Sequence, residues 1–223
     1  MDTNTITTQI FSLHDYFVIT LDYIGTLAFA ISGIRLASAK NFDLFGAFVV
    51  GLATAIGGGT LRDMMLGVPI FWMKNPIYFY ITFVALLLVW LFQAQVVRRK
   101  NTWFLFDTFG LGMFAVIGIE KALGAGQPMW VAIIMGSLTG AGGGVIRDVL
   151  LNEIPLVFRA EIYAVACVLG GVIYWFCHVV AGMPPIPCGL ACCFSVILTR
   201  LLAVKFHLGL PVFKGDENSN FPA

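Results

Sequence analysis

Long apolar stretches separated by short polar segments dominate the chain from residue 17 to residue 207. Each is about 20 residues long, which at ~1.5 Å per helical residue is enough to cross a bilayer core of ~30 Å. Three of them begin at a proline that would cost no helical hydrogen bond there, namely Pro76, Pro128 and Pro187. The pattern predicts seven transmembrane helices, at residues 17–38, 43–66, 77–96, 104–123, 128–151, 162–181 and 187–207.

Composition supports this interpretation and excludes several classes of protein. Charged residues make up 11% of the 223 residues, against about 25% in soluble domains. Such a low charge excludes a soluble globular domain and a nucleic-acid binder that uses a basic face. We therefore predict an all-α integral membrane protein with a single transmembrane domain at 17–207. It is flanked by a short N-terminal tail, 1–16, and a flexible C-terminal tail, 208–223.

The basic residues near the predicted span ends give an orientation. With the N-terminus outside, most of these residues fall on the cytoplasmic side: Lys40, Arg98, Arg99, Lys100, Arg159, Lys205 and Lys214. The outer loops then keep only Lys74 and Lys121. The sequence therefore predicts an outside N-terminus and a cytoplasmic C-terminus.

An internal repeat relates the two halves of the chain. Residues 22–78 align with residues 107–163 at an offset of 85 without a gap, and 18 of the 57 positions are identical. The strongest block is GGGTLRD at 57–63 and GGGVIRD at 142–148. Scattered matches of apolar residues are expected by chance, but a block with this spacing is not.

Each copy of the repeat holds three predicted spans, so the second copy must enter the membrane from the opposite side. The sequence predicts two inverted three-helix repeats, at about 17–96 and 104–181, followed by a seventh helix at about 187–207. Inverted repeats of this kind are typical of transport proteins, in which the pathway lies where the repeats meet.

The glycine triplets stand where a membrane helix would not ordinarily carry them, since each glycine costs roughly 1 kcal/mol relative to alanine. One interpretation is an interrupted helix whose free carbonyls line an ion path. The other is close packing of helices, which small residues also favour. The repetition of the triplet beside a charged pair favours the first interpretation, with these kink residues: Gly57, Gly58, Gly59, Gly142, Gly143 and Gly144.

Ionisable residues inside spans mark pathways or relays by default. Arg62 and Asp63 are neighbours in sequence and should point in different directions, so a pair within one helix is not expected. Depth along the spans predicts two separate clusters, one at each mouth: Asp22, Arg62 and Asp63, and Asp107, Arg147 and Asp148. Between them lie Thr54 and Thr139. The alternative is that these charges lock helices together and never meet an ion.

The seven spans, the inverted repeats and the doubled GGGxxRD block resemble the prokaryotic trimeric intracellular cation channels. The resemblance implies a homotrimer in a prokaryotic plasma membrane, with a pore in each protomer that conducts K+ and also Na+. Helices carrying Gly57–Gly59 and Gly142–Gly144 would form that pore, and bound membrane lipid is possible. The lysine-containing element of the animal members is replaced here by Arg62-Asp63 and Arg147-Asp148.

The sequence also bears on two functions other than ion conduction, transport by a carrier and catalysis. The same family is also labelled a putative glycine transporter, so a secondary carrier for glycine or another small amino acid is the alternative function. An enzyme is not expected, because no nucleophile and base, metal-ligand set or cofactor motif stands out in the sequence.

Overall fold

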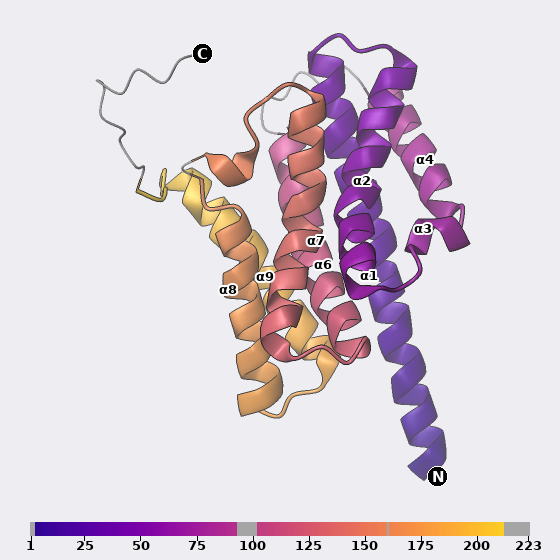
Figure 1. Ribbon diagram of the computed structural model, residues 1–223, viewed down its shortest axis with the longest axis vertical. Helices are drawn as coiled ribbons and strands as arrows, with labels where there is room; N and C mark the ends of the chain where they lie inside the picture. The colour runs from indigo at the N-terminus through magenta and orange to yellow at the C-terminus, as the bar shows by residue number, and fades with distance from the viewer. Residues whose placement is uncertain (1–2, 93–101, 160, 212–223) are drawn as a thin grey trace.

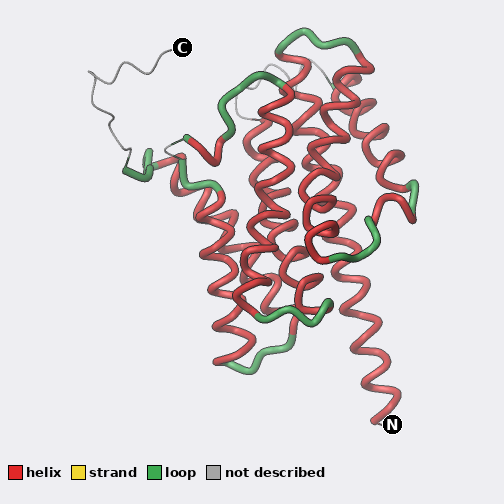
Figure 2. The backbone as a smooth tube through the Cα atoms, in the orientation of Figure 1, coloured by secondary structure: helices red, strands yellow, loops and turns green. Residues whose placement is uncertain are grey.

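The computed structural model describes residues 3–92, 102–159 and 161–211, whose regular structure is helical apart from one isolated antiparallel bridge. The helices follow one another as α1 (Thr3–Ala39), α2 (Leu44–Leu66), α3 (Phe71–Lys74), α4 (Ile77–Leu91), α6 (Thr102–Gly124), α7 (Met129–Leu150), η1 (Leu156–Phe158), α8 (Ala164–Trp175), η2 (Phe176–Val180) and α9 (Pro185–Lys205). They form one elongated bundle (Figure 1), joined by short loops that Figure 2 shows at its two ends and along its sides.

A helix occupies each of the seven predicted stretches, which confirms an all-helical membrane fold. Within the described residues, five helices are long and apolar enough to cross a membrane: Leu13–Ala39, Leu44–Leu66, Trp103–Gly124, Met129–Leu150 and Pro185–Lys205. Two shorter apolar helices, Ile77–Leu91 and Ala164–Val180, occupy the other two stretches. The last residues of the third predicted span, 93–96, lie outside the described residues.

The first helix differs from its prediction. It begins at Thr3 instead of residue 17, so most of the predicted tail 1–16 is helical and extends past the rest of the bundle (Figure 1). Residues 3–24 contain no proline or glycine, so nothing in this segment interrupts the helix that the apolar span begins. Of the predicted C-terminal tail, residues 212–223 lie outside the described residues.

Local sequence explains where several helices begin and end. The Asp43 carboxylate accepts a hydrogen bond from the Gly46 amide at 2.7 Å and caps α2. The same helix ends at Gly67, which has a φ of 64° that glycine adopts without strain. Pro76 and Pro128 immediately precede α4 and α7, whereas α9 begins at Pro185, two residues before the predicted start.

Four helices form the centre of the bundle: α1, α2, α6 and α7. Helix α4 packs on α1 and α2, while α8 packs on α7 and α9 packs on α6 and α8. Side chains in the centre, such as Phe29, Leu111 and Val116, are fully buried. Large apolar side chains on the outer helices are exposed, among them Trp90 of α4 and Phe194 of α9, as expected of a surface that faces lipid.

Helices α2 and α7 lie side by side and run in opposite directions, so the Arg-Asp pair of one is displaced toward one end of the bundle and that of the other toward the opposite end (Figure 1). Each pair lies four to five residues beyond the central glycine of the triplet in its own helix, or roughly 6–8 Å at about 1.5 Å per residue. This arrangement keeps the two charged pairs apart, as the depth argument predicted.

Candidate functional site

The glycine triplets lie where α2 crosses α7, and both helices continue through them without a break. A Cβ atom on Gly58 would overlap the carbonyl oxygen of Thr139 and stand 3.1 Å from the Gly143 amide nitrogen. A Cβ atom on Gly143 would overlap the carbonyl oxygen of Thr54 in the same way. The prediction of interrupted helices is therefore wrong for this structure, since both helices are continuous. The glycines instead bring the two backbones into direct contact.

Of the other four glycines of the triplets, three face side chains and Gly142 faces backbone. A Cβ atom on Gly57 would lie 2.5 Å from Cδ1 of Ile146, and one on Gly59 would lie 2.6 Å from the ring of Phe71. On the second helix, Gly142 faces the Gly58 backbone at 3.2 Å and Gly144 faces the Tyr163 hydroxyl. Only the central glycine of each triplet is thus closed off by the carbonyl of the opposite helix.

The two threonines beside the crossing are buried. The Thr54 hydroxyl donates to the Val50 carbonyl at 2.6 Å, and the Thr139 hydroxyl donates to the Met135 carbonyl at 2.5 Å. Each hydroxyl is therefore bound within its own helix, while the carbonyl of the same residue faces the other helix. Binding of an ion by these hydroxyls would require them to rotate away from these carbonyls.

The α7 cluster consists of Asp107, Arg147 and Asp148, and all three are buried. The Arg147 guanidinium donates from Nε to Asp148 Oδ1 at 2.9 Å and from Nη1 to the Ser32 hydroxyl at 3.0 Å. Its Nη1 also forms an ion pair with Asp107 Oδ1. Asp148 Oδ2 accepts from the Leu156 amide at 3.1 Å. The structure thus brings together the three residues that depth along the spans grouped.

Two polar atoms of the α7 cluster have no hydrogen-bond partner in the part of the chain that the structure describes: Asp107 Oδ2 and Arg147 Nη2. Unpaired polar atoms inside a protein are costly unless water or an ion satisfies them. Asp107 Oδ2 is therefore the atom of the cluster that water or a cation can contact.

The α2 cluster consists of Arg62, Asp63 and Lys121. Arg62 donates from Nε to Asp63 Oδ1 at 2.8 Å, and Asp63 Oδ2 accepts from Lys121 Nζ at 2.8 Å and from the Phe71 amide at 3.0 Å. The Phe71 ring lies below both cations, 5.7 Å from the Arg62 guanidinium and 5.5 Å from Lys121 Nζ. Lys121 comes from α6, so this cluster joins the two repeats.

Three expectations about these charges need correction. An Arg-Asp pair does form within one helix at both sites, because the long arginine side chain folds back to its neighbour. Lys121, counted among the basic residues of the outer loops, lies in α6 and binds Asp63. Asp22, expected to pair with Arg62, accepts a hydrogen bond from Tyr78 at 2.5 Å, and the described residues include no Asp22–Arg62 ion pair.

Residues that the sequence analysis did not select are therefore Tyr78, Lys121 and Ser32. Tyr78 could have been found, since Tyr78 and Tyr163 are identical positions of the repeat and each hydroxyl points to the matching aspartate. Lys121 and Ser32 have no such signal, because their counterparts in the other copy are leucine and isoleucine.

Beyond the α7 cluster, Lys40 and Glu153 join the loop after α1 to the loop after α7. Lys40 Nζ lies 2.6 Å from Glu153 Oε1 and donates to the Leu151 carbonyl at 2.7 Å. These residues, together with Asp148 and Arg159, line a pocket of about 300 Å³. The hydrogen bond and charge of Lys40 lower the pKa of the Glu153 carboxyl below its ordinary value.

We expect this connection to weaken in acid. Because the pKa of Glu153 is lowered by folding, the pair contributes its full stability above the ordinary carboxyl pKa and loses it as the pH falls through the lowered value. The protection factors of the two loops, which correct hydrogen exchange for the intrinsic rate at each pH, should fall on acidification, and E153Q should show low protection factors already at neutral pH. Unchanged exchange in E153Q would contradict this role of the pair.

This chain is similar to known bacterial membrane proteins. A family model described as glycine transporter matches residues 19–94 and 104–179. The UPF0126 inner membrane protein YadS of Escherichia coli is 42% identical over 201 residues, covering 89% of this chain and 97% of YadS. A UPF0126 membrane protein of Vibrio cholerae is 44% identical over 196 residues, covering 86% of this chain and 81% of that protein.

Among solved structures, the TRIC trimeric intracellular cation channel orthologue from Rhodobacter sphaeroides matches with a TM-score of 0.80 and 33% identity, covering 86% of this chain and 98% of that one. The family match spans both halves of the chain, and the identities extend over most of its length. The chain therefore belongs to the bacterial membrane-protein family that is described as glycine transporter, and it shares that family with the UPF0126 proteins and the prokaryotic TRIC channels.

Proposed function

We propose that this protein is a channel for monovalent cations, chiefly K+ and also Na+. The observation that carries the proposal is the pair of buried charge clusters, one toward each end of α2 and α7, with a carboxylate oxygen left unpaired in the α7 cluster. Ionisable groups at this depth are costly and mark ion pathways by default. The similarity to solved TRIC cation channels supports the same function.

The proposed architecture is seven transmembrane helices arranged as two inverted repeats and a final helix. Contacts that recur 85 residues apart support it: Asp63 and Asp148 each accept from the backbone amide eight residues later, at 3.0 and 3.1 Å. Gly58 and Gly143 are also 85 residues apart. Each lacks a side chain at the point where a carbonyl of the other helix approaches. The distribution of lysine and arginine favours an outside N-terminus.

In the proposed mechanism this structure is a closed state. The backbone contact at the α2–α7 crossing and the buried rings of Phe29 and Phe114, whose centroids are 5.0 Å apart, fill the centre of the bundle. The ion pairs Lys121–Asp63 and Arg147–Asp107 close the path on either side of this centre. Opening requires the two helices to separate and at least one aspartate of each cluster to face the path.

The proposed selectivity is weak between K+ and Na+. The sequence contains no TVGYG-like filter in which rows of carbonyls replace the hydration shell of an ion. Aspartates would instead attract hydrated cations to the mouths and repel anions. We further propose a homotrimer in a bacterial plasma membrane, since the related solved channel is named as trimeric and the relatives as membrane proteins.

A carrier for glycine is the second candidate, favoured by the description of the family model. Proteoliposomes that contain the purified protein and a K+ gradient distinguish the two. A channel produces K+ flux that rises with concentration without saturating at low millimolar levels, and no glycine uptake above that of empty liposomes. Saturable glycine uptake without K+ flux would reverse the assignment.

Removal of the Lys121 charge should increase cation conduction. In K121M the Asp63 carboxylate keeps Arg62 but loses its second cation, so the mouth becomes more negative. We expect the K+ conductance at low ionic strength to rise roughly two- to tenfold, and the increase to shrink in high salt, which screens the charge. K74M, which removes an exposed lysine on α3, is the control and should change little. Equal effects of the two variants would show that Lys121 has no special position on the path.

A further inference from the structure

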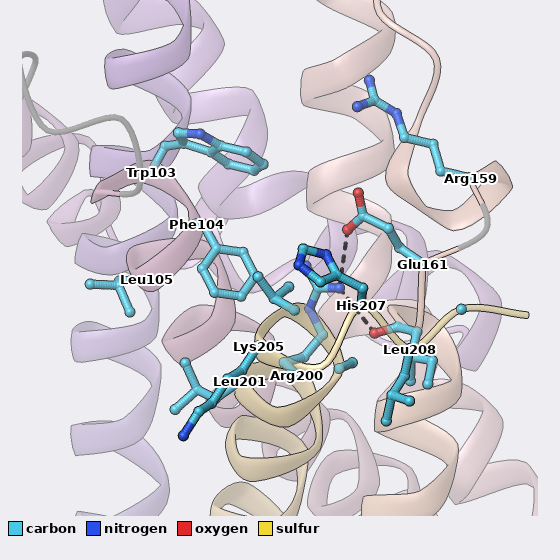
Figure 3. Close-up of a pocket in the computed structure, with 14 residues that line it drawn as sticks. Trp103, Phe104, Leu105, Arg159, Glu161, Arg200, Leu201, Lys205, His207 and Leu208 are labelled. Carbon is cyan, nitrogen blue, oxygen red and sulfur yellow. Dashed lines mark hydrogen bonds and ion pairs between the residues drawn. The ribbon is translucent and has the colours of Figure 1, made fainter.

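A pocket away from the α2–α7 crossing is lined by both charged and apolar side chains. It has a volume of about 830 Å³ and is formed by the start of α6, the segment that leads into α8, the end of α9 and the turn that follows it (Figure 3). The antiparallel bridge between Glu161 and Gly209 holds this turn against the segment before α8. The pocket is therefore a structured feature at one end of the bundle.

Arg200 of α9 lines this pocket and is fully buried. Its guanidinium lies between two aromatic rings, 5.1 Å from the centroid of Phe104 and 5.0 Å from that of Tyr163. Nη1 lies 3.3 Å from Glu161 Oε2 and donates to the Ile162 carbonyl at 3.0 Å, as the dashed lines in Figure 3 indicate. These contacts fix the position of the charge.

The remaining donors of Arg200, Nε and Nη2, have no hydrogen-bond partner among residues 3–92, 102–159 and 161–211. Unpaired donors of a buried cation are unfavourable unless a ligand satisfies them, and planar guanidinium groups bind phosphate and carboxylate with two parallel hydrogen bonds. The free donors of Arg200 thus point to an anionic ligand.

The charges around the pocket favour an anion as well. Arg159, Arg200 and Lys205 contribute three positive charges to the lining, whereas Glu161 contributes one negative charge. His207 also lines the pocket, and an imidazole N–H is a hydrogen-bond donor. The carboxylate of Glu161 occupies only one of the Arg200 nitrogens and is itself 41% exposed.

The rest of the lining is apolar and suits an acyl chain. It consists of aromatic and aliphatic side chains, of which the following are the largest: Trp103, Phe104, Leu105, Leu201, Val204 and Leu208. Several of them are exposed, and the exposed apolar surface continues along α9 through Leu198. A free inorganic anion gains nothing from contact with these apolar side chains. A phospholipid places its headgroup on the Arg200 charge and its acyl chains along α9.

We propose that this pocket binds an anionic phospholipid, with the headgroup phosphate on Nε and Nη2 of Arg200 and the acyl chains along α6 and α9. The site is independent of ion conduction, so it does not depend on whether the protein is a channel or a carrier. It lies at the end of two membrane helices, where the headgroup layer of a bilayer is expected.

Lipid binding to the full-length protein in neutral detergent tests the proposal directly. Native mass spectrometry should detect phosphatidylglycerol bound at least tenfold more tightly than phosphatidylcholine, and R200Q should lose about tenfold of that affinity. E161Q should bind phosphatidylglycerol several-fold more tightly, because it removes the carboxylate that competes for Arg200. K74A, which removes a lysine on α3, is the charge-matched control and should bind as the unchanged protein does.

The E161Q arm keeps the proposal falsifiable if R200Q fails to fold, because Glu161 is partly exposed. Unchanged or weaker phosphatidylglycerol binding in E161Q would overturn the proposal, since a purely structural Arg200–Glu161 pair predicts no gain. Equal binding of both lipids would also overturn it. Inorganic phosphate that displaces phosphatidylglycerol at equimolar concentration would assign the site to a free anion instead of a lipid.

Discussion

Replacement of Gly58 by alanine should prevent normal assembly of the bundle. The added Cβ atom would overlap the Thr139 carbonyl, which belongs to the backbone of a packed helix and cannot rotate away. The helices α2 and α7 would have to move apart by about 1 Å, and overpacking of this kind costs about 3 kcal/mol or more when the backbone must shift. We expect a large drop in the thermal unfolding temperature measured in detergent, or loss of the folded protein. G143A should behave in the same way, since its Cβ atom would overlap the Thr54 carbonyl.

Neighbouring glycines provide matched controls. In G57A the added methyl group meets only the Ile146 side chain, and the one short contact is to Cδ1, its flexible end, so the change should remain within about 1 kcal/mol. In G124A it meets nothing within 4 Å, and the higher helix propensity of alanine should make that variant neutral or slightly more stable. A G58A protein as stable as G57A would contradict the close contact at the crossing.

Replacement of Arg147 by glutamine should be strongly destabilising. The change removes the cation that neutralises both Asp107 and Asp148, whose side chains are buried. Removal of one partner of a buried ion pair costs about 3–5 kcal/mol, because the other charge stays buried without compensation. Thermal unfolding of the purified protein measures this effect.

The corresponding variant of the α2 cluster is the control. In R62Q the Asp63 carboxylate retains Lys121 at 2.8 Å and the Phe71 amide at 3.0 Å, so the loss of stability should be clearly smaller. The double variant D107N/R147Q should recover part of the stability lost in R147Q, since it removes the stranded charge as well. Equal losses in R147Q and R62Q would contradict the difference between the two clusters.

Much of the fold could be predicted because membrane helices are specified by length and composition. The predicted stretch 43–66 differs by one residue from α2, and 128–151 by one residue at each end from α7. The start of α1 could not be predicted in this way. A polar segment without proline or glycine can form either a helix or a coil, and its sequence pattern does not distinguish the two. The short helix α3 between α2 and α4 was likewise not anticipated.

The candidate site was predicted less completely, and the errors have physical causes. Depth along a helix correctly separated Arg62 from Asp148, because an axial distance follows from residue number alone. Which atoms meet at one depth depends on side-chain reach and on the rotation of each helix, which the sequence does not contain. Asp22 therefore binds Tyr78, and Lys121 reaches Asp63 from α6.

The glycine triplets are a second feature whose structural role the sequence leaves open. Their repetition identified the point where the two halves meet, but a missing side chain permits either an opened helix or a close approach. The structure adopts the second at Gly58 and Gly143, with both helices continuous. In the proposed mechanism this contact between α2 and α7 both packs the two helices together and closes the ion path.

Single-channel recording in a planar bilayer with a tenfold KCl gradient tests the central proposal most directly. A cation channel gives discrete current steps that reverse near the K+ equilibrium potential, about 59 mV for this gradient, and that shift little when Na+ replaces K+ on one side. The absence of current steps from protein that takes up glycine in proteoliposomes, or a reversal potential on the chloride side of zero, would contradict the account.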